Sequence, residues 1–293
     1  MKKILITGAT GNIGSETIRG LKELGRENNL IAAHYDIDKS KKALQAYPEL
    51  EHRKLDFEKP DTFDPALAGV DIVFLVRPPG LADVEKYFKP FLESIKRNGI
   101  NRIAFLSVQG AESQPKIPHY KIEQLVLNQG LEYIFLRPSY FMQNLTTTLV
   151  REIREENRIF IPAGNLPFTW VDARDIGVTA AILLEEFEKF SNSSVEITGS
   201  EQKNFNEVAG LLTEMTGREI RYVSPNLIRF FLKKRNQGVP AAMIFVMIML
   251  HYLPRFSKKP TRLTNEVKNI TGRTPGTLEA FIERELKKFE PKS

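Results

Sequence analysis

The sequence predicts an α/β protein built on a doubly wound parallel sheet, followed by a smaller C-terminal α/β lobe. Short, continuously apolar segments alternate with amphipathic segments through the first half of the chain, and a glycine-rich loop joins the first two of them. The alternation becomes looser after Pro138. Continuous apolar strands separated by helices are typical of a parallel sheet that is covered on both faces.

The predicted elements follow one another at the spacing of βα units. In the first half, strands are expected at 3–7, 30–33, 71–76, 102–106 and 132–136, with a further strand ending at 55–57, and helices at 12–25, 83–97 and 119–129. Beyond residue 138, helices are expected at 173–187, 204–216, 226–236, 240–252 and 277–289, and strands at 194–198 and 219–223. We assign 1–155, with 170–200 returning to them, to the sheet domain and 156–293 to the smaller lobe.

The composition is that of a folded globular protein and narrows the chemistry. Of the 293 residues, 42% are hydrophobic and 27% are charged, which is too balanced for a disordered chain. There is no cysteine, which excludes disulfides and thiolate chemistry, and the four histidines are scattered, so no metal site is expected. The N-terminal apolar run is too short for a signal peptide, so a cytoplasmic location is expected.

The net charge of +6 comes from one segment, because residues 220–265 hold nine basic residues and no acidic one. They are Arg221, Arg229, Lys233, Lys234, Arg235, Arg255, Lys258, Lys259 and Arg262. No helix-turn-helix or zinc signature accompanies them, so direct binding to nucleic acid is not expected. The same segment contains the longest apolar run, 241–250, which is about half a membrane span. It predicts either a buried lobe helix or a surface that contacts a membrane, a protein partner or a lipophilic acceptor.

The glycine-rich loop predicts a dinucleotide site. Gly8, Gly11 and Gly14 form the pattern G-x-x-G-x-x-G between the first strand and the first helix. In that context Gly8 permits a tight turn, Gly11 lets the backbone approach a pyrophosphate, and Gly14 lets the helix pack closely on the strand. The free N–H groups of the helix N-terminus favour the phosphates. These features predict a Rossmann-type domain that binds NAD(H) or NADP(H), and the alternative is an ordinary βα turn that contains glycines.

The end of the second strand bears on the choice of dinucleotide. Asp36 lies 22 residues beyond the last glycine of the loop. A carboxylate there accepts hydrogen bonds from the adenosine ribose of NAD and repels the 2′-phosphate of NADP, so NAD is favoured. Three lysines, Lys39, Lys41 and Lys42, are near enough to bind a phosphate instead. Asp36 is also a candidate N-cap of the next helix, a role that Asp38 could fill.

The third strand ends at Asp56 and Phe57. There, Asp56 is expected to meet the adenine amino group and Phe57 to flank the adenine ring. The alternative is that Asp56 stabilises a turn.

These features, with segments further along, resemble the NmrA-like group of atypical short-chain dehydrogenases. The resemblance covers essentially the whole chain. Its marks are ITGATGNIG at the N-terminus, FLSVQGAE (105–112), HYKIEQLVLNQGLEYIFLRPSYFMQN (119–144), WVDARDIG (170–177), VEITGSE (195–201) and ITGRTPGTLEAF (270–281). It implies a doubly wound Rossmann domain with NAD(P) in its crevice and a small C-terminal lobe over the nicotinamide.

The resemblance also implies roles for single residues. The phosphates would be lined by Thr10, Asn12 and Ile13, and the adenine ribose and pyrophosphate would be passed by Val76, Arg77 and Pro78. The nicotinamide would be bordered by Ser107, Pro138, Ser139 and Tyr140. The substrate would be faced by Met142, Gln143 and Asn144. For Tyr140, Phe141 and Met142 the alternative is packing in the core.

The catalytic pattern of the wider superfamily, Tyr-x-x-x-Lys on one helix, is broken here, because Tyr120 is followed four residues later by Gln124. Lys121 lies about 100° round the helix from Tyr120, so the two cannot pair. The resemblance then implies hydride transfer with little acid–base help. Lys121 would orient the ribose, and His119 or Tyr120 would donate a proton, unless both merely pack at the helix start.

We therefore expect an NAD(P)H-dependent oxidoreductase that transfers hydride to a small aromatic or quinone-like acceptor, as a monomer or homodimer. The alternative is a protein that holds the dinucleotide, senses its redox state and reports it to a protein partner without turnover. An epimerase acting on a nucleotide sugar is less favoured, because that chemistry usually needs the tyrosine that is lost here.

Overall fold

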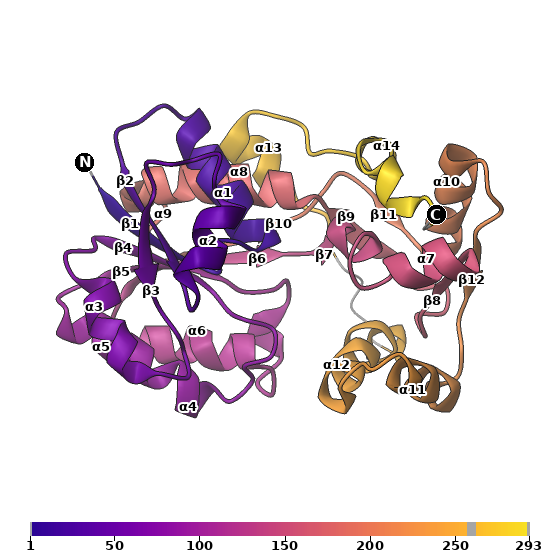
Figure 1. The fold of residues 1–293 in the computed structure, drawn as a ribbon, viewed down its shortest axis with the longest axis horizontal. Coiled ribbons are helices and arrows are strands. Elements are labelled where there is room, and N and C mark those ends of the chain that lie inside the picture. Colours follow the sequence, from indigo (N-terminus) through magenta and orange to yellow (C-terminus); the bar gives the residue numbers. More distant parts are fainter. Residues whose placement is uncertain (1, 257–261, 292–293) are drawn as a thin grey trace. The chain divides into compact units, whose positions relative to one another are not determined.

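The larger of two compact units contains a seven-stranded, all-parallel sheet with the strand order β10-β6-β5-β4-β1-β2-β3 (Figure 1). The computed structural model describes residues 2–256 and 262–291. The strands are β1 (Lys3–Thr7), β2 (Asn29–His34), β3 (Glu51–Lys54), β4 (Ile72–Val76), β5 (Arg102–Leu106), β6 (Glu132–Pro138) and β10 (Ser193–Ile197). The predicted doubly wound fold is confirmed.

Helices cover both faces of this sheet (Figure 1). One face carries α1 (Asn12–Glu23), α8 (Ala173–Glu185) and α13 (Glu266–Thr271), and the other carries α3 (Phe63–Leu67), α4 (Val84–Tyr87), α5 (Lys89–Arg97) and α6 (Pro118–Asn128). The short helices α2 (Ile37–Ala43) and α9 (Phe187–Phe190) complete the unit. The single helix predicted at 83–97 is two helices, because the chain bends at Phe88 and Pro90 begins the first turn of α5.

Two glycines allow α1 and α8 to pack closely. A Cβ on Gly177 would lie 2.5 Å from the backbone of Glu16, and one on Gly20 would lie 2.9 Å from the Cβ of Ala181. Any larger residue would push the helices apart, so this contact holds α8 against the helix that begins at the glycine-rich loop.

Among the described residues, the second unit consists of short strands and five α-helices around its own core. Its strands form two small sheets, β7 (Tyr140–Phe141) with β9 (Phe168–Val171) and β11 (Gln202–Lys203), and β8 (Arg158–Phe160) with β12 (Arg221–Val223). Its helices are α7 (Val150–Glu156), α10 (Phe205–Thr216), α11 (Leu227–Asn236), α12 (Ala241–His251) and α14 (Leu278–Arg284). The core includes the fully buried Trp170, whose indole N–H donates to the carbonyl oxygen of Lys203 at 2.8 Å.

The unit boundaries differ from the predicted domains. The first unit comprises Met1–Ser139, Ala173–Ile197 and Glu266–Arg273. The chain thus leaves it at Ser139, not after residue 155, because the segment beyond β6 packs into the second core. It also returns at 266–273, which we had assigned to the lobe, because α13 packs on α8 and β10.

A buried ion pair joins two helices of the second unit. Lys234 on α11 donates from Nζ to Glu152 on α7, and the two residues are only 2% and 1% exposed. The other carboxylate oxygen of Glu152 is buried without a hydrogen-bond partner among the described residues. This basic residue of the 220–265 segment therefore lies in the core and not on the surface.

The apolar helix α12 is neither wholly buried nor wholly exposed. One stripe, formed by Ile244, Met247 and His251, faces the core, while Phe245, Val246 and Leu250 are exposed. The run 241–250 therefore has one buried face, as expected of a lobe helix, and one exposed face, as expected of a contact surface. Within the described ranges, no helix combines the length and the apolar character needed to cross a bilayer.

Candidate functional site

Predicted cofactor residues follow the carboxyl ends of six neighbouring parallel strands. Gly8 follows β1, Asp36 follows β2, Asp56 follows β3, Arg77 follows β4, Ser107 follows β5 and Ser139 follows β6. In a doubly wound sheet the ligand binds outside this edge, where the strand order reverses. Here that point lies between β1 and β4.

The glycine loop leaves open space at one position and none at another. A Cβ on Gly14 would lie 2.3 Å from the carbonyl oxygen of Gly8, so close packing of α1 on β1 requires glycine. A Cβ on Gly11 would meet only that same oxygen, at 3.2 Å, and Gly11 is exposed. Asn12 is also exposed and Thr10 is half-buried, but the Ile13 side chain is buried, so only its backbone can face a ligand.

Arg77 places an unpaired cation at the switch point. Its Nη1 donates to the carbonyl oxygens of Pro78, Pro79 and Leu81 at 3.0, 3.3 and 2.8 Å, and no acidic side chain of the described residues pairs with it. Burial lowers the pKa of Arg77, yet an arginine stays protonated at neutral pH. Next to it, the hydroxyl of Thr7 accepts from the backbone N–H of Val76 at 2.7 Å, which ties β1 to β4.

Two polar atoms at this edge are buried without a hydrogen-bond partner among the described residues. They are Nε of Arg77 and Oγ of Ser139. Because buried polar atoms are almost always paired in folded proteins, these two fit a polar ligand at the edge. Together with the exposed backbone of Gly11, these two atoms make the edge suitable for binding a dinucleotide.

Ser107 is held by a buried ionic cluster that the sequence analysis missed. Its hydroxyl donates to Glu123 at 2.5 Å, and Arg137 donates to both oxygens of Glu123 at 3.0 and 2.7 Å. The hydroxyl proton of Ser107 is therefore engaged, which leaves Ser107 as a hydrogen-bond acceptor. Glu123 stands between Ile122 and Val126 on the buried face of α6, a position that could have indicated a buried acidic residue. Nothing in the sequence indicates that its partner is Arg137.

Asp36 is the N-cap of α2, as the alternative interpretation had it. Its carboxylate accepts from the backbone N–H of Lys39 at 3.1 Å, and its second oxygen lies 3.9 Å from the ammonium of Lys39. The carboxylate is about one-third exposed, so capping does not prevent contact with a ribose.

If Asp36 disfavours a 2′-phosphate, Asp36→Asn will raise the NADPH-to-NADH affinity ratio about tenfold, because about 1.4 kcal/mol of like-charge repulsion is removed. Asparagine keeps the helix cap, which alanine would not. Titration of both dinucleotides measures the ratio, and Asp38→Asn on the same helix is the matched control. An unchanged ratio would place the selecting group elsewhere, at Tyr35 or the lysines of α2.

Asp56 and Phe57 do not both lie where they were expected. Asp56 organises a turn, accepting from the backbone N–H of Glu58 at 3.0 Å, in line with the alternative interpretation. The ring of Phe57 is only 6% exposed and packs against Phe63, Phe88 and Phe91. It belongs to the core beneath the sheet and has little surface left for an adenine, so the expectation for Phe57 is corrected.

The three catalytic candidates begin α6 but have different surroundings. The His119 ring stacks on Phe105 with centroids 6.1 Å apart. Burial and then the nearby charge of Arg77 lower the pKa of His119 to about 3, so the ring is neutral at physiological pH and is not an acid donor. Tyr120 is half-buried, and Lys121 is exposed without an ion pair to any described residue. Tyr120 and Lys121 therefore stay candidates, and the stacking of His119 on Phe105 is in line with the packing alternative for that residue.

Tyr140 and Met142 lie in the core of the second unit. Tyr140 packs edge-on against Trp170 at 4.8 Å and hydrogen-bonds Nε2 of His251 at 2.8 Å. Nδ1 of His251 lies 2.6 Å from the carbonyl oxygen of Met247, which can only accept, so Tyr140 is the donor to Nε2. Burial raises the pKa of Tyr140 and lowers that of His251 to about 4. Met142 is fully buried, so it does not face a substrate.

The side-chain amides of Gln143 and Asn144 are held by polar contacts. The side-chain N–H of Gln143 donates to the buried carboxylate of Asp172 at 2.7 Å, and Arg284 donates to the other oxygen of Asp172 at 2.7 Å. The side chain of Asn144 hydrogen-bonds the Tyr140 hydroxyl. Both amides are thus anchored within the second unit.

A doubly wound parallel sheet with a glycine-rich first βα turn and polar residues at its carboxyl edge defines a dinucleotide-binding Rossmann protein. The chain belongs to the NmrA-like family, whose model matches residues 1–252. The resemblance seen in the sequence is therefore confirmed.

The chain is similar to three proteins with different names. The chain is 31% identical to prestalk A differentiation protein A of Dictyostelium discoideum, over 95% of this chain and 90% of that protein. It is 28% identical to the NAD(P)H azoreductase of Xenophilus azovorans, over 98% and 99% of the two chains. The crystal structure of an NADPH-dependent quinone oxidoreductase from Escherichia coli, complexed with NADPH, matches with a TM-score of 0.83 and 19% identity, over 97% and 99%. The last likeness concerns the fold alone.

Proposed function

We propose that the protein is an NAD(P)H-dependent oxidoreductase that reduces a small aromatic or quinone-like acceptor. The observation that carries the proposal is the carboxyl edge of the sheet, where an open glycine follows β1, an arginine without an ion pair to any described residue follows β4, and a buried serine hydroxyl without a described hydrogen-bond partner follows β6. When bound at this edge, a reduced nicotinamide supplies hydride. The reductases among the similar proteins support the same class of reaction.

Of the residues near the expected nicotinamide end, His119 and Ser107 offer little acid catalysis, and Tyr120 is the remaining candidate for a proton donor. His119 is neutral, the proton of Ser107 is engaged by Glu123, and Gln124 stands where the superfamily has its lysine. An aldehyde or ketone needs a proton donor as its oxygen becomes an alkoxide. A quinone spreads the incoming charge over its ring system and can take its protons from water, so this site favours such acceptors.

Loss of NADPH and NADH absorbance with a panel of quinones, azo dyes, aldehydes and ketones tests the proposal. We expect turnover with quinone or azo acceptors and none with simple ketones. His119→Gln should leave the pH profile unchanged between about pH 6 and pH 8, because His119 carries no proton to lose there. Fast ketone reduction, or a step in the profile that His119→Gln removes, would contradict the proposed chemistry.

The alternative of a redox-sensing protein keeps one observation in its favour, the missing Tyr-x-x-x-Lys pair. A sensor would bind the oxidised and reduced dinucleotides with clearly different affinities and oxidise neither NADH nor NADPH with any acceptor of the panel. That result, with tight binding retained, would replace the enzyme proposal.

A further inference from the structure

Exposed apolar side chains gather in one stretch of the second unit. Eleven large hydrophobic residues of the described chain are exposed, and eight of them lie between residues 228 and 263. They are Ile228, Leu232, Phe245, Val246, Leu250, Leu253, Phe256 and Leu263. Ile228 is 74% exposed and Phe256 68%. Single exposed hydrophobic residues are normal on a protein surface, but a cluster of this size marks an interaction site.

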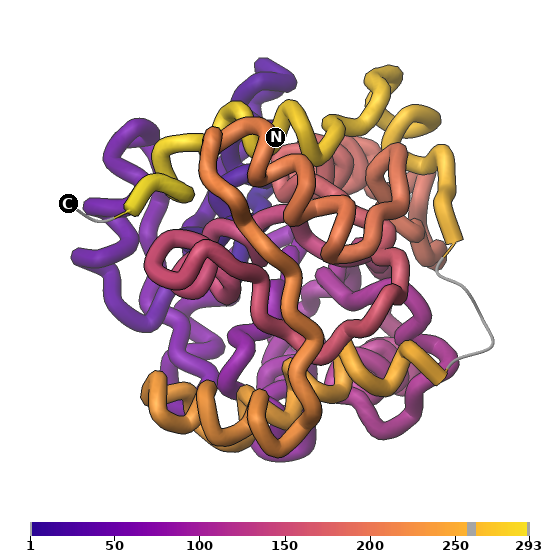
Figure 2. The backbone as a smooth tube through the Cα atoms, turned by 90° about the vertical axis from the view of Figure 1, so that its right-hand side faces the viewer, coloured from indigo at the N-terminus to yellow at the C-terminus, as the bar shows by residue number. Residues whose placement is uncertain are grey.

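Helices α11 and α12 form the greater part of this surface. They pack side by side, with the rings of Phe231 and Phe245 5.6 Å apart, and follow one another at the lower margin of the second unit in both backbone views (Figures 1 and 2). On α12 the exposed residues Phe245, Val246 and Leu250 recur at helical spacing opposite the buried stripe. The surface is thus one face of an ordered, anchored helix pair.

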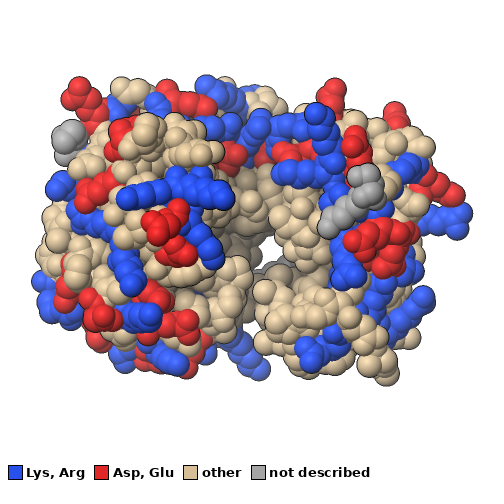
Figure 3. Space-filling model, viewed as in Figure 1, with Lys and Arg blue, Asp and Glu red and all other residues tan. Residues whose placement is uncertain are grey.

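The exposed face of α11 mixes apolar and basic side chains. Ile228 and Leu232 are one turn apart, and Arg229 and Arg235 are exposed beside them without an ion pair to any described residue. In the space-filling view the region of α11 and α12 is mostly tan, with blue patches (Figure 3). No acidic residue occurs anywhere in 220–265. Lys258 and Lys259 lie outside the described residues.

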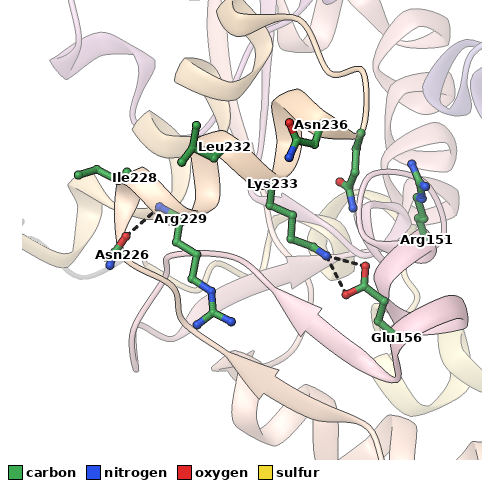
Figure 4. A pocket seen from close by; sticks show the side chains of 9 residues that line it. Arg151, Glu156, Asn226, Ile228, Arg229, Leu232, Lys233 and Asn236 are labelled. Carbon is green, nitrogen blue, oxygen red and sulfur yellow. Dashed lines mark hydrogen bonds and ion pairs between the residues drawn. The ribbon is translucent and has the colours of Figure 1, made fainter.

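A groove runs beside α11 on the same unit. It has a volume of about 710 Å³ and is lined by Ile228, Arg229, Leu232 and Lys233 from α11, opposite Arg151 and Glu156 from α7 (Figure 4). Lys233 donates to Glu156 at 2.6 Å and Arg151 pairs with Glu155 at 3.0 Å, so Arg229 is the basic group of the groove without an ion pair to any described residue. The guanidinium of Arg229 extends below the helix in that view.

We propose that the solvent faces of α11, α12 and the turn at 253–256, here called the α11–α12 face, bind the surface of an anionic lipid bilayer. Apolar side chains can enter the headgroup boundary while neighbouring arginines meet lipid phosphates. Charge complementarity favours this occupant over a second copy of the chain. A two-fold contact would bring Arg229 and Arg235 of both copies onto one positive, apolar interface, where like charges repel.

Co-sedimentation of the full chain with vesicles tests the proposal. We expect binding to phosphatidylglycerol-containing vesicles at low salt, weaker binding at high salt, and little binding to pure phosphatidylcholine. Arg229→Gln with Arg235→Gln should weaken binding about fivefold for each charge removed. Lys268→Gln with Lys287→Gln, which removes two exposed charges outside the face, is the matched control and should bind like the parent.

The apolar half of the face has its own variant. Ile228→Gln with Leu250→Gln should lose vesicle binding, while Leu127→Gln, an exposed leucine on α6, should not. Vesicle binding that is absent at low salt, or that neither double variant weakens, would overturn the proposal. A dimer that only Ile228→Gln with Leu250→Gln dissociates in sedimentation velocity would assign the face to a second copy. Dinucleotide binding is measured on the same variants. A variant that loses vesicle binding and keeps dinucleotide binding shows that the two functions are tested separately.

Discussion

A valine at position 11 is expected to abolish dinucleotide binding and leave the fold intact. Gly11 has φ −81° and ψ 171°, an extended conformation that valine adopts readily. Its Cβ would meet only the carbonyl oxygen of Gly8 inside the protein. The rest of the side chain would project from the exposed loop into the space where the backbone approaches a pyrophosphate.

Thermal or urea unfolding with and without ligand measures the loss. At a concentration of one hundred times Kd, ligand stabilises the parent by about 2.7 kcal/mol, and Gly11→Val should show none of this gain. Gly210→Val is the matched control, because a Cβ there on α10 meets no atom within 4 Å and should keep the full gain. A folded Gly11→Val protein that binds as tightly as the parent would show that the dinucleotide lies elsewhere.

The second large effect is on stability. Lys234→Met should lower the free energy of unfolding by about 3–5 kcal/mol, because it leaves the carboxylate of Glu152 buried without its cation. Urea unfolding measures the change. Lys233→Met, on the same helix, removes the partly exposed pair with Glu156 and should cost about 1 kcal/mol or less.

A double variant separates the loss of charge pairing from the loss of packing. Glu152→Leu with Lys234→Met removes both charges and should recover most of the stability, since apolar replacements of a buried pair are often neutral. If the double variant is as unstable as Lys234→Met alone, the cost would come from packing and not from the stranded carboxylate.

The sheet domain was predictable because each strand is a continuous apolar run. β1 and β5 begin and end at the predicted residues, since each apolar run is bounded by glycine or by polar residues. The helix α7 was not predicted, because its sequence VREIREE shows only Val150 and Ile153 on an apolar face. α13 is six residues long, too short for a periodic pattern to stand out.

The candidate site was predictable only as far as local sequence defines it. The glycine loop and Asp36 are positioned by the strands just before them. Phe57 was assigned to the adenine because it lies at the end of the predicted third strand, but its ring packs against Phe63 nearby in the chain and against Phe88 and Phe91 from a later segment. The contacts of Ser107 with Glu123, of Gln143 with Asp172 and of Tyr140 with His251 join residues 16, 29 and 111 positions apart. Spacing along the chain carries no signal of such pairs.

The division of the chain into interleaved segments has a consequence for its synthesis. The sheet gains its last strand, β10, only with residues 193–197, and the helix that covers α8 and β10 only with 266–271. While the ribosome is still adding the second unit, the exposed side of β6 has no neighbouring strand. Unpaired strand edges invite association with other chains. A nascent chain arrested before residue 193 should therefore aggregate more readily than one arrested after residue 273, and neither unit can be excised as a contiguous fragment that keeps all of its own elements.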